Sequence, residues 1–410
     1  MTDNTTATNL NRPRNILFAN VDPRQPVVLE FSHAVGASLQ THKLIINQSN
    51  HDDVWPGGAL WDCGILLSLV VLGVAGVSDT ITLTATPLEE GKKEDASTSK
   101  KDQKKKNKST TRVVKKTFSQ VSNRLVQYCT KDSSNFGGAT TLQTLQDILL
   151  QRAHLRIVEF GCGVGLTGLV AAVASGASST ILTDLTVVVD QVTRGNVDQN
   201  TTAASNTGKK KSCNSNANTP TALSFVEQSR TIRHFKGLGK VLAMPLCWGN
   251  QEEGEQVLQA LQELHQSALQ HQHSTSTSKK KKKQNKNTNQ LQPNNDSSEN
   301  EEHAAPYPDL ILLGDVAYQH KPGAPSHFDI LLESLLQLMP PIEETATNPK
   351  HRQQLLLFGT RIRMPASMDL LELLQSHLSL LMSIPAHCLD PSLQQVKHNM
   401  TVHVFTNTKS

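Results

Sequence analysis

The sequence has few aromatic residues, no paired cysteine motif and no long apolar run. Phe, Trp and Tyr make up 4% of the 410 residues, and none of the six cysteines forms a CxxC pair or lies beside a histidine cluster at zinc spacing. We therefore expect free thiols in a reducing compartment and no metal site. The longest apolar run, residues 63–77, is shorter than the roughly 20 residues that span a bilayer, so it predicts a buried helix. The polar N-terminus has no signal-peptide core, and we expect a soluble, intracellular protein.

The charges are unevenly distributed along the chain, although the formal net charge is only +4. The polar stretches 92–116, 201–222 and 265–305 hold 20 basic and 7 acidic residues, which leaves the rest of the chain at −9. An acidic folded body with basic, low-complexity inserts excludes a uniformly basic nucleic-acid-binding fold. We expect the lysine runs to be solvated and disordered, with a nuclear-localisation or nucleic-acid patch as the alternative.

Strands and helices alternate through the second half of the chain, which predicts a doubly wound, mostly parallel α/β sheet. We expect residues 1–54 to form an N-terminal extension with short β-strands, and residues 55–410 to form one domain with disordered inserts at 89–116, 201–222 and 270–305. The predicted strands are 27–31, 44–47, 81–85, 155–160, 180–183, 240–245, 309–313, 354–358 and 401–405. The predicted helices are 63–77, 142–151, 166–174, 187–199, 255–269, 328–338 and 367–380.

The strongest motif is VEFGCGVG, at residues 158–165. A predicted strand leads into a loop in which Gly161 and Gly163 allow a ligand to approach the backbone closely. The dinucleotide fingerprint GxGxxG is not met, because the third glycine, Gly165, comes one residue early. Glu159, two residues before the first glycine, would repel a pyrophosphate and suits a positively charged ligand without phosphate.

Asp184 ends the next predicted strand, 23 residues after Gly161. An acid at this position can accept hydrogen bonds from both hydroxyls of a ribose. Together with Glu159, it indicates an adenosine ligand that carries positive charge and no phosphate, which is S-adenosylmethionine. A structural glycine turn in an unrelated α/β domain is the alternative interpretation.

Six short segments then carry a family resemblance: ALWD (59–62), VEFGCGVG (158–165), LTD (182–184), LCWG (246–249), DLILLGDVAY (309–318) and TRIR (360–363). In this order they resemble the seven-β-strand (class I) methyltransferases, and among these the protein-lysine methyltransferases of methyltransferase family 16. The last segment resembles the branch that methylates heat-shock proteins and p97. The resemblance implies a seven-stranded, Rossmann-like methyltransferase sheet. We expect one of Arg361 and Arg363 to face an acidic group and the other to face solvent.

The resemblance implies a site for S-adenosyl-L-methionine and a site for the methyl acceptor. Asp315 and Tyr318 are the implied catalytic pair on the acceptor side, and they follow a predicted parallel strand at its carboxyl end, where open α/β sheets bind ligands. A helix N-cap for Asp315, a packing role for Tyr318 and core packing for the tryptophans are the alternatives. The cofactor-binding residues that we predict are Trp61, Glu159, Gly161, Cys162, Gly163, Asp184, Trp248 and Gly314.

We therefore predict methyl transfer from S-adenosylmethionine to the ε-amine of lysine in a protein substrate. The resemblance implies substrates such as a chaperone, a p97-type ATPase, a translation factor or calmodulin. The alternatives are a small-molecule N-methyltransferase, an NAD(P)-dependent oxidoreductase, and a catalytically silent adaptor that binds acidic partners or RNA through the lysine runs. We expect a cytoplasmic monomer without membrane or nucleic-acid partners, and the lysine runs leave a nuclear location open.

Overall fold

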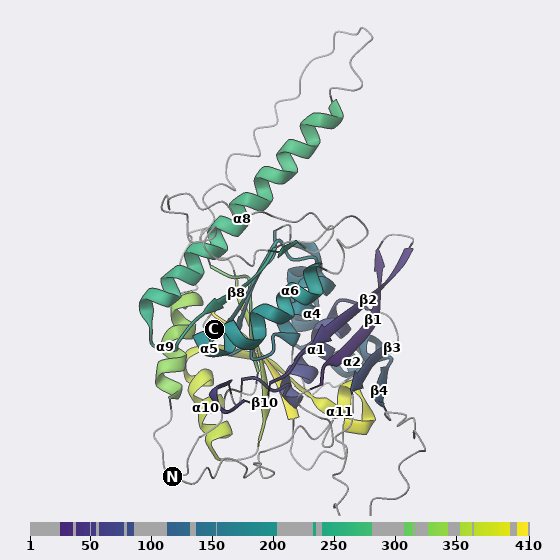
Figure 1. Cartoon of the computed structure of the whole chain (residues 1–410). Helices are drawn as coiled ribbons and strands as arrows, with labels where there is room; N and C mark the ends of the chain where they lie inside the picture. Colours follow the sequence, from purple (N-terminus) through teal and green to yellow (C-terminus); the bar gives the residue numbers. More distant parts are fainter. Residues whose placement is uncertain are drawn as a thin grey trace, which may run out of the picture.

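Two β-sheets with helices packed around them make up the fold (Figure 1). Alternate residues of the central strands enter two hydrophobic clusters, so that Leu310 and Leu312 belong to one cluster and Ile311 and Leu313 to the other. This alternation is that of a sheet buried on both faces. The computed structural model describes residues 25–35, 38–49, 51–54, 57–77, 80–85, 113–131, 137–152, 154–202, 233–234, 240–280, 307–314, 316, 327–342, 353–362, 365–393 and 400–408.

The large sheet has the strand order β11-β12-β10-β9-β5-β6-β8-β7. Its central strands β10, β9, β5, β6 and β8 are parallel, and β12 pairs antiparallel with both β10 and β11. Apart from the two-residue edge strand β7, this is a seven-stranded, mostly parallel sheet, which confirms the predicted fold class. The strands are β5 (Arg156–Phe160), β6 (Ser179–Asp184), β7 (Arg233–His234), β8 (Lys240–Pro245), β9 (Leu310–Gly314), β10 (Leu355–Arg361), β11 (Ser379–Pro385) and β12 (Met400–Thr406).

The direction in which strands are added reverses between β5 and β9. From β5 the chain proceeds outward to β6 and β8, whereas from β9 it proceeds to β10 on the other side. Open α/β sheets bind ligands outside the carboxyl ends of their strands at such a switch point. The topology therefore directs attention to the residues that follow Phe160 and Gly314.

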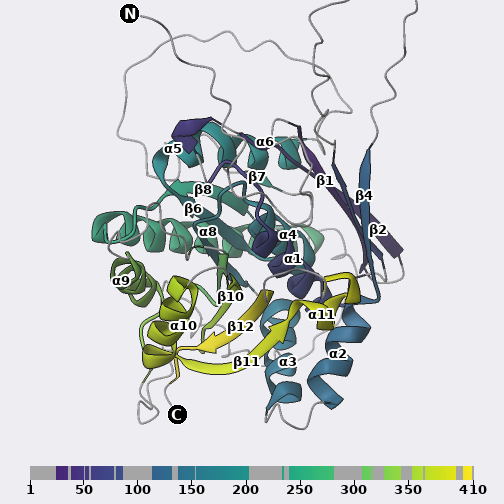
Figure 2. The same ribbon diagram turned by 90° about the horizontal axis from the view of Figure 1, so that it is seen from below.

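Helices cover both faces of the large sheet (Figure 2). One face carries α1 (Asp62–Val74), α2 (Val121–Lys131), α3 (Gly138–Gln146), α4 (Leu166–Ser175) and α6 (Arg194–Thr202), and the other carries α8 (Gln251–Lys280), α9 (Phe328–Leu338) and α10 (Pro365–His377). Helix α1 is apolar on all sides and almost entirely buried, as its sequence predicts. Within the ranges described, no helix combines the length and apolar character needed to cross a membrane.

A second, four-stranded sheet has the order β2-β1-β3-β4, with antiparallel neighbours throughout. Its strands are β1 (Val27–Val35), β2 (Ser38–Ile46), β3 (Thr80–Ala85) and β4 (Val114–Ser119), so it joins segments from both sides of residue 54. Two side chains of α6 attach β2 to the rest of the fold. Asn200 bonds both the N–H and the C=O of Ile45, and Asn196 does the same with Asn47, at 2.7–3.0 Å.

Several predicted boundaries are wrong. Strand β1 ends at Val35 and β2 begins at Ser38, whereas the predicted strands are 27–31 and 44–47, and three further differences follow. Strand β4 begins at Val114, so the first insert does not extend to residue 116. The prediction fails because the lysines of this strand resemble those of the insert in sequence. Helix α8 continues to Lys280, past the expected start of the third insert at 270, through Gln, His, Ser and Thr residues that show no apolar period. Strand β11 begins at Ser379, where we predict the end of a helix. Most residues of the three inserts lie outside the described part of the chain.

Candidate cofactor-binding site

A glycine loop joins β5 to α4 at the switch point. Gly161, Gly163 and Gly165 have φ angles of 58°, 54° and 78°, a region that residues with a Cβ rarely adopt. A Cβ at Gly163 would also lie only 2.8 Å from the carbonyl oxygen of Gly57. The geometry of this loop therefore depends on the glycines that the sequence analysis singled out.

Asp184 faces this loop from the end of β6. Its Oδ2 accepts a hydrogen bond from the N–H of Gly163 at 2.8 Å, and its Oδ1 accepts one from the N–H of Leu185 at 2.7 Å. A carboxylate offers about four lone-pair positions, so it can accept further donors such as the two hydroxyls of a ribose. Burial raises the pKa of Asp184, whereas the two backbone hydrogen bonds act in the opposite direction.

Glu159 lies beneath the first turn of α4 and is only 4% exposed. Its Oε2 accepts a hydrogen bond of 2.9 Å from the N–H of Gly168. Burial raises the pKa of Glu159 to about 8, although hydrogen bonds from Gly168 and Thr167 act to lower it. The carboxyl group is thus mostly protonated at neutral pH, and its attraction for a cationic ligand is weaker than the sequence predicts. The reason is its burial, which the sequence does not reveal.

Cys162 contributes its backbone to the loop, while its thiol is buried beneath it. Its N–H donates to the carbonyl oxygen of Thr183 at 2.9 Å, and its Sγ lies 3.7 Å from Oγ1 of Thr193. The Thr193 hydroxyl in turn donates to the carbonyl oxygen of Gly163 at 2.6 Å. Burial raises the pKa of the Cys162 thiol well above its usual range, so the thiol stays neutral. Sequence reasoning missed Thr193, which no motif marks.

Of the other predicted cofactor residues, Trp248 lies beside the loop, whereas Trp61 and Gly314 adjoin α1. Cζ2 of Trp248 lies 3.5 Å from the position of a Cβ on Gly161. Trp61 precedes α1, whose first turn is tied to α4 by a 3.2 Å hydrogen bond from the Thr167 hydroxyl to the carbonyl oxygen of Gly64. Gly314 ends β9 against α1, since a Cβ there would lie 3.1 Å from Leu67. Trp61, Trp248 and Gly314 are all half-buried.

The predicted acceptor-side pair, Asp315 and Tyr318, lies outside the described residues, as does Arg363. Val316, between the pair, is described and buried. A Cβ on Gly161 would lie 3.1 Å from its Cγ1. The chain therefore passes directly beside the glycine loop after leaving β9.

A buried ion pair joins two of the six motif segments. Nη1 of Arg361, at the end of β10, donates to Oδ2 of Asp62, at the start of α1, over 2.9 Å, and the two side chains are 6% and 0% exposed. This confirms that one of the two arginines faces an acidic group. Burial lowers the pKa of nearby Lys116 in β4, and Asp390 and Asp62 oppose this shift. The pair fixes the start of α1, and with it Trp61, at the carboxyl edge of the sheet.

A groove with a volume of about 430 Å³ lies away from the glycine loop, between α2 and α11 (Ala386–Leu389). None of the residues that line it is a predicted site residue. Among the described residues, no group of three or more His, Cys, Asp or Glu side chains could hold a metal ion.

The sequence model of a lysine methyltransferase family matches residues 125–287 of this chain. The matched part begins in α2, contains the glycine loop, Asp184 and Trp248, and ends beyond α8. The match supports the lysine methyltransferase family. It agrees with the seven-stranded sheet and with S-adenosylmethionine as the methyl donor of such enzymes. The TRIR segment, on which the resemblance to one branch of the family depends, lies outside the matched residues. No curated protein matches the sequence.

Proposed function

We propose that this protein transfers methyl groups from S-adenosylmethionine to the ε-amine of lysine in a protein substrate. The observation that carries the proposal is the position of Asp184 opposite a glycine loop at the switch point of a seven-stranded sheet. The family match supports methyl transfer. The segments 309–318 and 360–363, which resemble those of protein-lysine methyltransferases, support a protein acceptor.

The residues of the site fit this cofactor. The glycines of the loop have no side chains that would keep a ligand away from the backbone. Asp184 can accept further hydrogen bonds from a ribose, and the half-buried Trp61 and Trp248 offer aromatic surfaces. Bound S-adenosylmethionine supplies an electrophilic methyl group on a positively charged sulfur. A nearby positive charge lowers the pKa of a carboxyl group, so Glu159 would become more acidic than it is in this structure.

The acceptor lysine must be neutral to attack the methyl group, although the free side chain has a pKa near 10.4. A pocket that removes water from the ammonium lowers this pKa, whereas a carboxylate raises it. We therefore assign Asp315 to orienting the amine rather than deprotonating it, and Tyr318 to the wall of the lysine channel, where its ring face favours a cation. Most of the rate gain would come from holding amine and methyl in line.

Labelling of a cell extract with tritiated-methyl S-adenosylmethionine tests the proposal. We expect a labelled protein band, such as a cytoplasmic chaperone, a p97-type ATPase or a translation factor, and mass spectrometry should locate the methyl group on a lysine. Label found only in small molecules would instead show a small-molecule methyltransferase. The absence of any label would favour the silent adaptor.

Substitution of Asp315 tests the acceptor side separately. Asp315→Ala should abolish protein labelling and leave the affinity for S-adenosylmethionine nearly unchanged, because the residue is assigned to the amine. Asp329→Ala, which removes an exposed acid at the start of α9, is the matched control and should label normally. Labelling by Asp315→Ala at the wild-type rate would contradict the role given to Asp315.

A further inference from the structure

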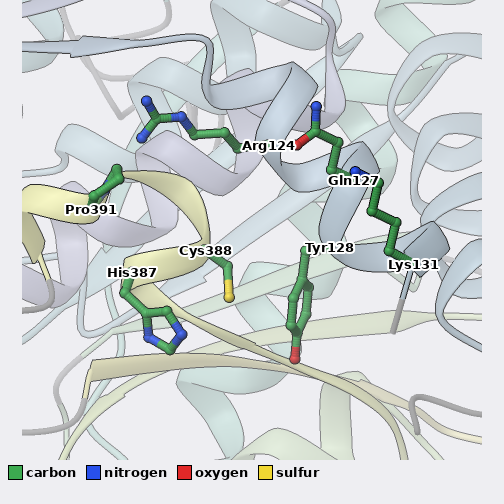
Figure 3. Close-up of a pocket in the computed structure, with 7 residues that line it drawn as sticks. All are labelled: Arg124, Gln127, Tyr128, Lys131, His387, Cys388 and Pro391. Atoms are coloured by element: carbon green, nitrogen blue, oxygen red, sulfur yellow. The ribbon is translucent and has the colours of Figure 1, made fainter. Parts of the chain in front are cut away.

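Helix α2 turns a polar face toward α11. Arg124, Gln127, Tyr128 and Lys131 recur at helical spacing and therefore share one face, while Val121, Leu125 and Cys129 on an adjoining face are buried in the core. Together with α11 and the turn after it, this face encloses the groove of about 430 Å³. Figure 3 shows Tyr128 and Cys388 facing each other across the groove, with Arg124 extending toward the side of Pro391.

The groove is held in place by contacts beneath it. The Tyr128 hydroxyl donates to the carbonyl oxygen of Ser383 in β11 at 2.8 Å, and Sγ of Cys129 lies 3.5 Å from Sδ of Met382. These contacts fix α2 on β11, so the wall of the groove is preformed. Strand β11 runs parallel to β10, because both pair antiparallel with β12, and α11 directly follows its carboxyl end. The groove and the glycine loop therefore lie at the same edge of the large sheet.

The lining of the groove is basic. Arg124, Lys131 and His387 line it, and no acidic side chain among the residues that the structure describes does. Nη1 of Arg124 is buried and has no hydrogen-bond partner among the described residues. A buried guanidinium N–H without a partner is unfavourable, and a carboxylate is the acceptor that pairs best with it. Asp390, which precedes the lining residue Pro391, is itself buried and accepts the N–H of Ser392 at 2.8 Å, and Asp132, which follows Lys131, lies outside the described residues.

We propose that this groove binds an acidic side chain of the methyl-accepting protein and so helps to select the substrate. The inference rests on the proposed function, because it is the acceptor that must approach this edge of the sheet. A short acidic segment would meet the local positive charge. A long polyanion such as RNA would extend past the groove and be repelled by the rest of the chain, which has a net charge of −9 outside the basic stretches.

Binding of a fluorescein-labelled oligoglutamate peptide, followed by anisotropy at low salt, tests the groove directly. We expect the wild type to bind it and not an oligoglutamine peptide of the same length. Arg124→Gln/Lys131→Gln should weaken binding about tenfold or more, because charge-assisted hydrogen bonds are lost. The matched control, Lys43→Gln/Lys115→Gln, removes two exposed lysines outside the groove and should bind like the wild type.

Three outcomes would overturn the proposal: no binding of oligoglutamate, equal weakening by both double variants, or stronger binding of an oligouridylate of matched charge. The last would identify a nucleic-acid site instead. Thermal melting and titration with S-adenosylmethionine verify that each variant is folded. If the Arg124 change disturbs folding, Lys131→Gln alone provides the test, since Lys131 is exposed at the end of α2.

The extract labelling experiment then connects the groove to the substrate. Protein labelling by Arg124→Gln/Lys131→Gln should fall, while the affinity for S-adenosylmethionine stays that of the wild type. Normal labelling by this variant would show that the substrate does not use the groove. If the wild type labels no protein, the proposed function fails, and the oligoglutamate titration still decides whether the groove binds acidic peptide.

Discussion

Glu159 shows at the scale of one residue how burial changes the chemistry that a sequence suggests. Its pKa is raised from an ordinary carboxyl value to about 8. Because the folded pKa is the higher one, the stability that the neutral carboxyl contributes is complete below the unfolded pKa and is lost as the pH rises through 8. The wild-type protein should therefore lose stability between about pH 5 and pH 8 through this group.

Glu159→Gln should remove this pH dependence, since glutamine imitates the protonated acid and can still accept the N–H of Gly168. We expect the variant to be clearly more stable than the wild type at about pH 9 and similar to it at acid pH. Urea unfolding midpoints across the pH range are the measurement. Glu333→Gln, on the exposed face of α9, is the control and should follow the wild type. Parallel curves for Glu159→Gln and the wild type would contradict the raised pKa.

The residues that the sequence revealed are those whose neighbours are close in the chain. The glycine loop and Asp184 were recognisable because a strand leads to each of them, and their spacing is that of one βαβ unit. The partner of Arg361 was not identifiable, because Asp62 is 299 residues away. Thr193, which supports the loop, ends the π-helical turn Val189–Thr193 and belongs to no motif.

At the scale of elements, the ion pair between Asp62 and Arg361 joins α1 to β10. Asp62→Asn or Arg361→Met alone should each destabilise the protein by about 3–5 kcal/mol, because each leaves a buried charge without its partner. The double variant should be less destabilised than the sum of the two single variants. Chemical unfolding of the four proteins measures this coupling. Glu30→Gln, which breaks the exposed pair with Lys43, should cost less than about 1 kcal/mol.

Additive effects of the two single substitutions would contradict a direct interaction.

The elements that the sequence missed have weak patterns of their own. Strand β4 contains two consecutive lysines and one fully buried residue, Phe118, and β11 is an edge strand with only two fully buried positions. Their place is decided by pairing with β3 and β12, which are distant or later in the chain.

At the scale of the whole molecule, the first basic insert connects two strands that are already paired. Ala85 at the end of β3 is the cross-strand partner of Val114 at the start of β4, so a short Asn-Gly loop can join them. Replacing residues 86–112 by such a loop should leave the melting temperature within a few degrees and preserve cofactor binding, because the entropy of closing a loop depends only weakly on its length.

The control for this replacement removes residues 86–116. It deletes half of β4, including Lys116, and should lower the melting temperature clearly. Equal losses in the two proteins would show that the insert itself stabilises the fold.

The net charge of the whole chain describes neither part of it. The basic residues concentrate in the inserts, whereas the candidate cofactor residues lie in the acidic body.

Titration calorimetry with S-adenosylmethionine tests the central claim most directly. We predict that the wild-type protein binds S-adenosylmethionine and not NAD, and that Asp184→Asn weakens this binding by about tenfold to a hundredfold, because one acceptor oxygen is lost. Asp190→Asn, an exposed acid paired only with Arg194 among the described residues, should bind like the wild type. A wild-type protein that binds NAD, or that gives no heat with S-adenosylmethionine, would contradict the account.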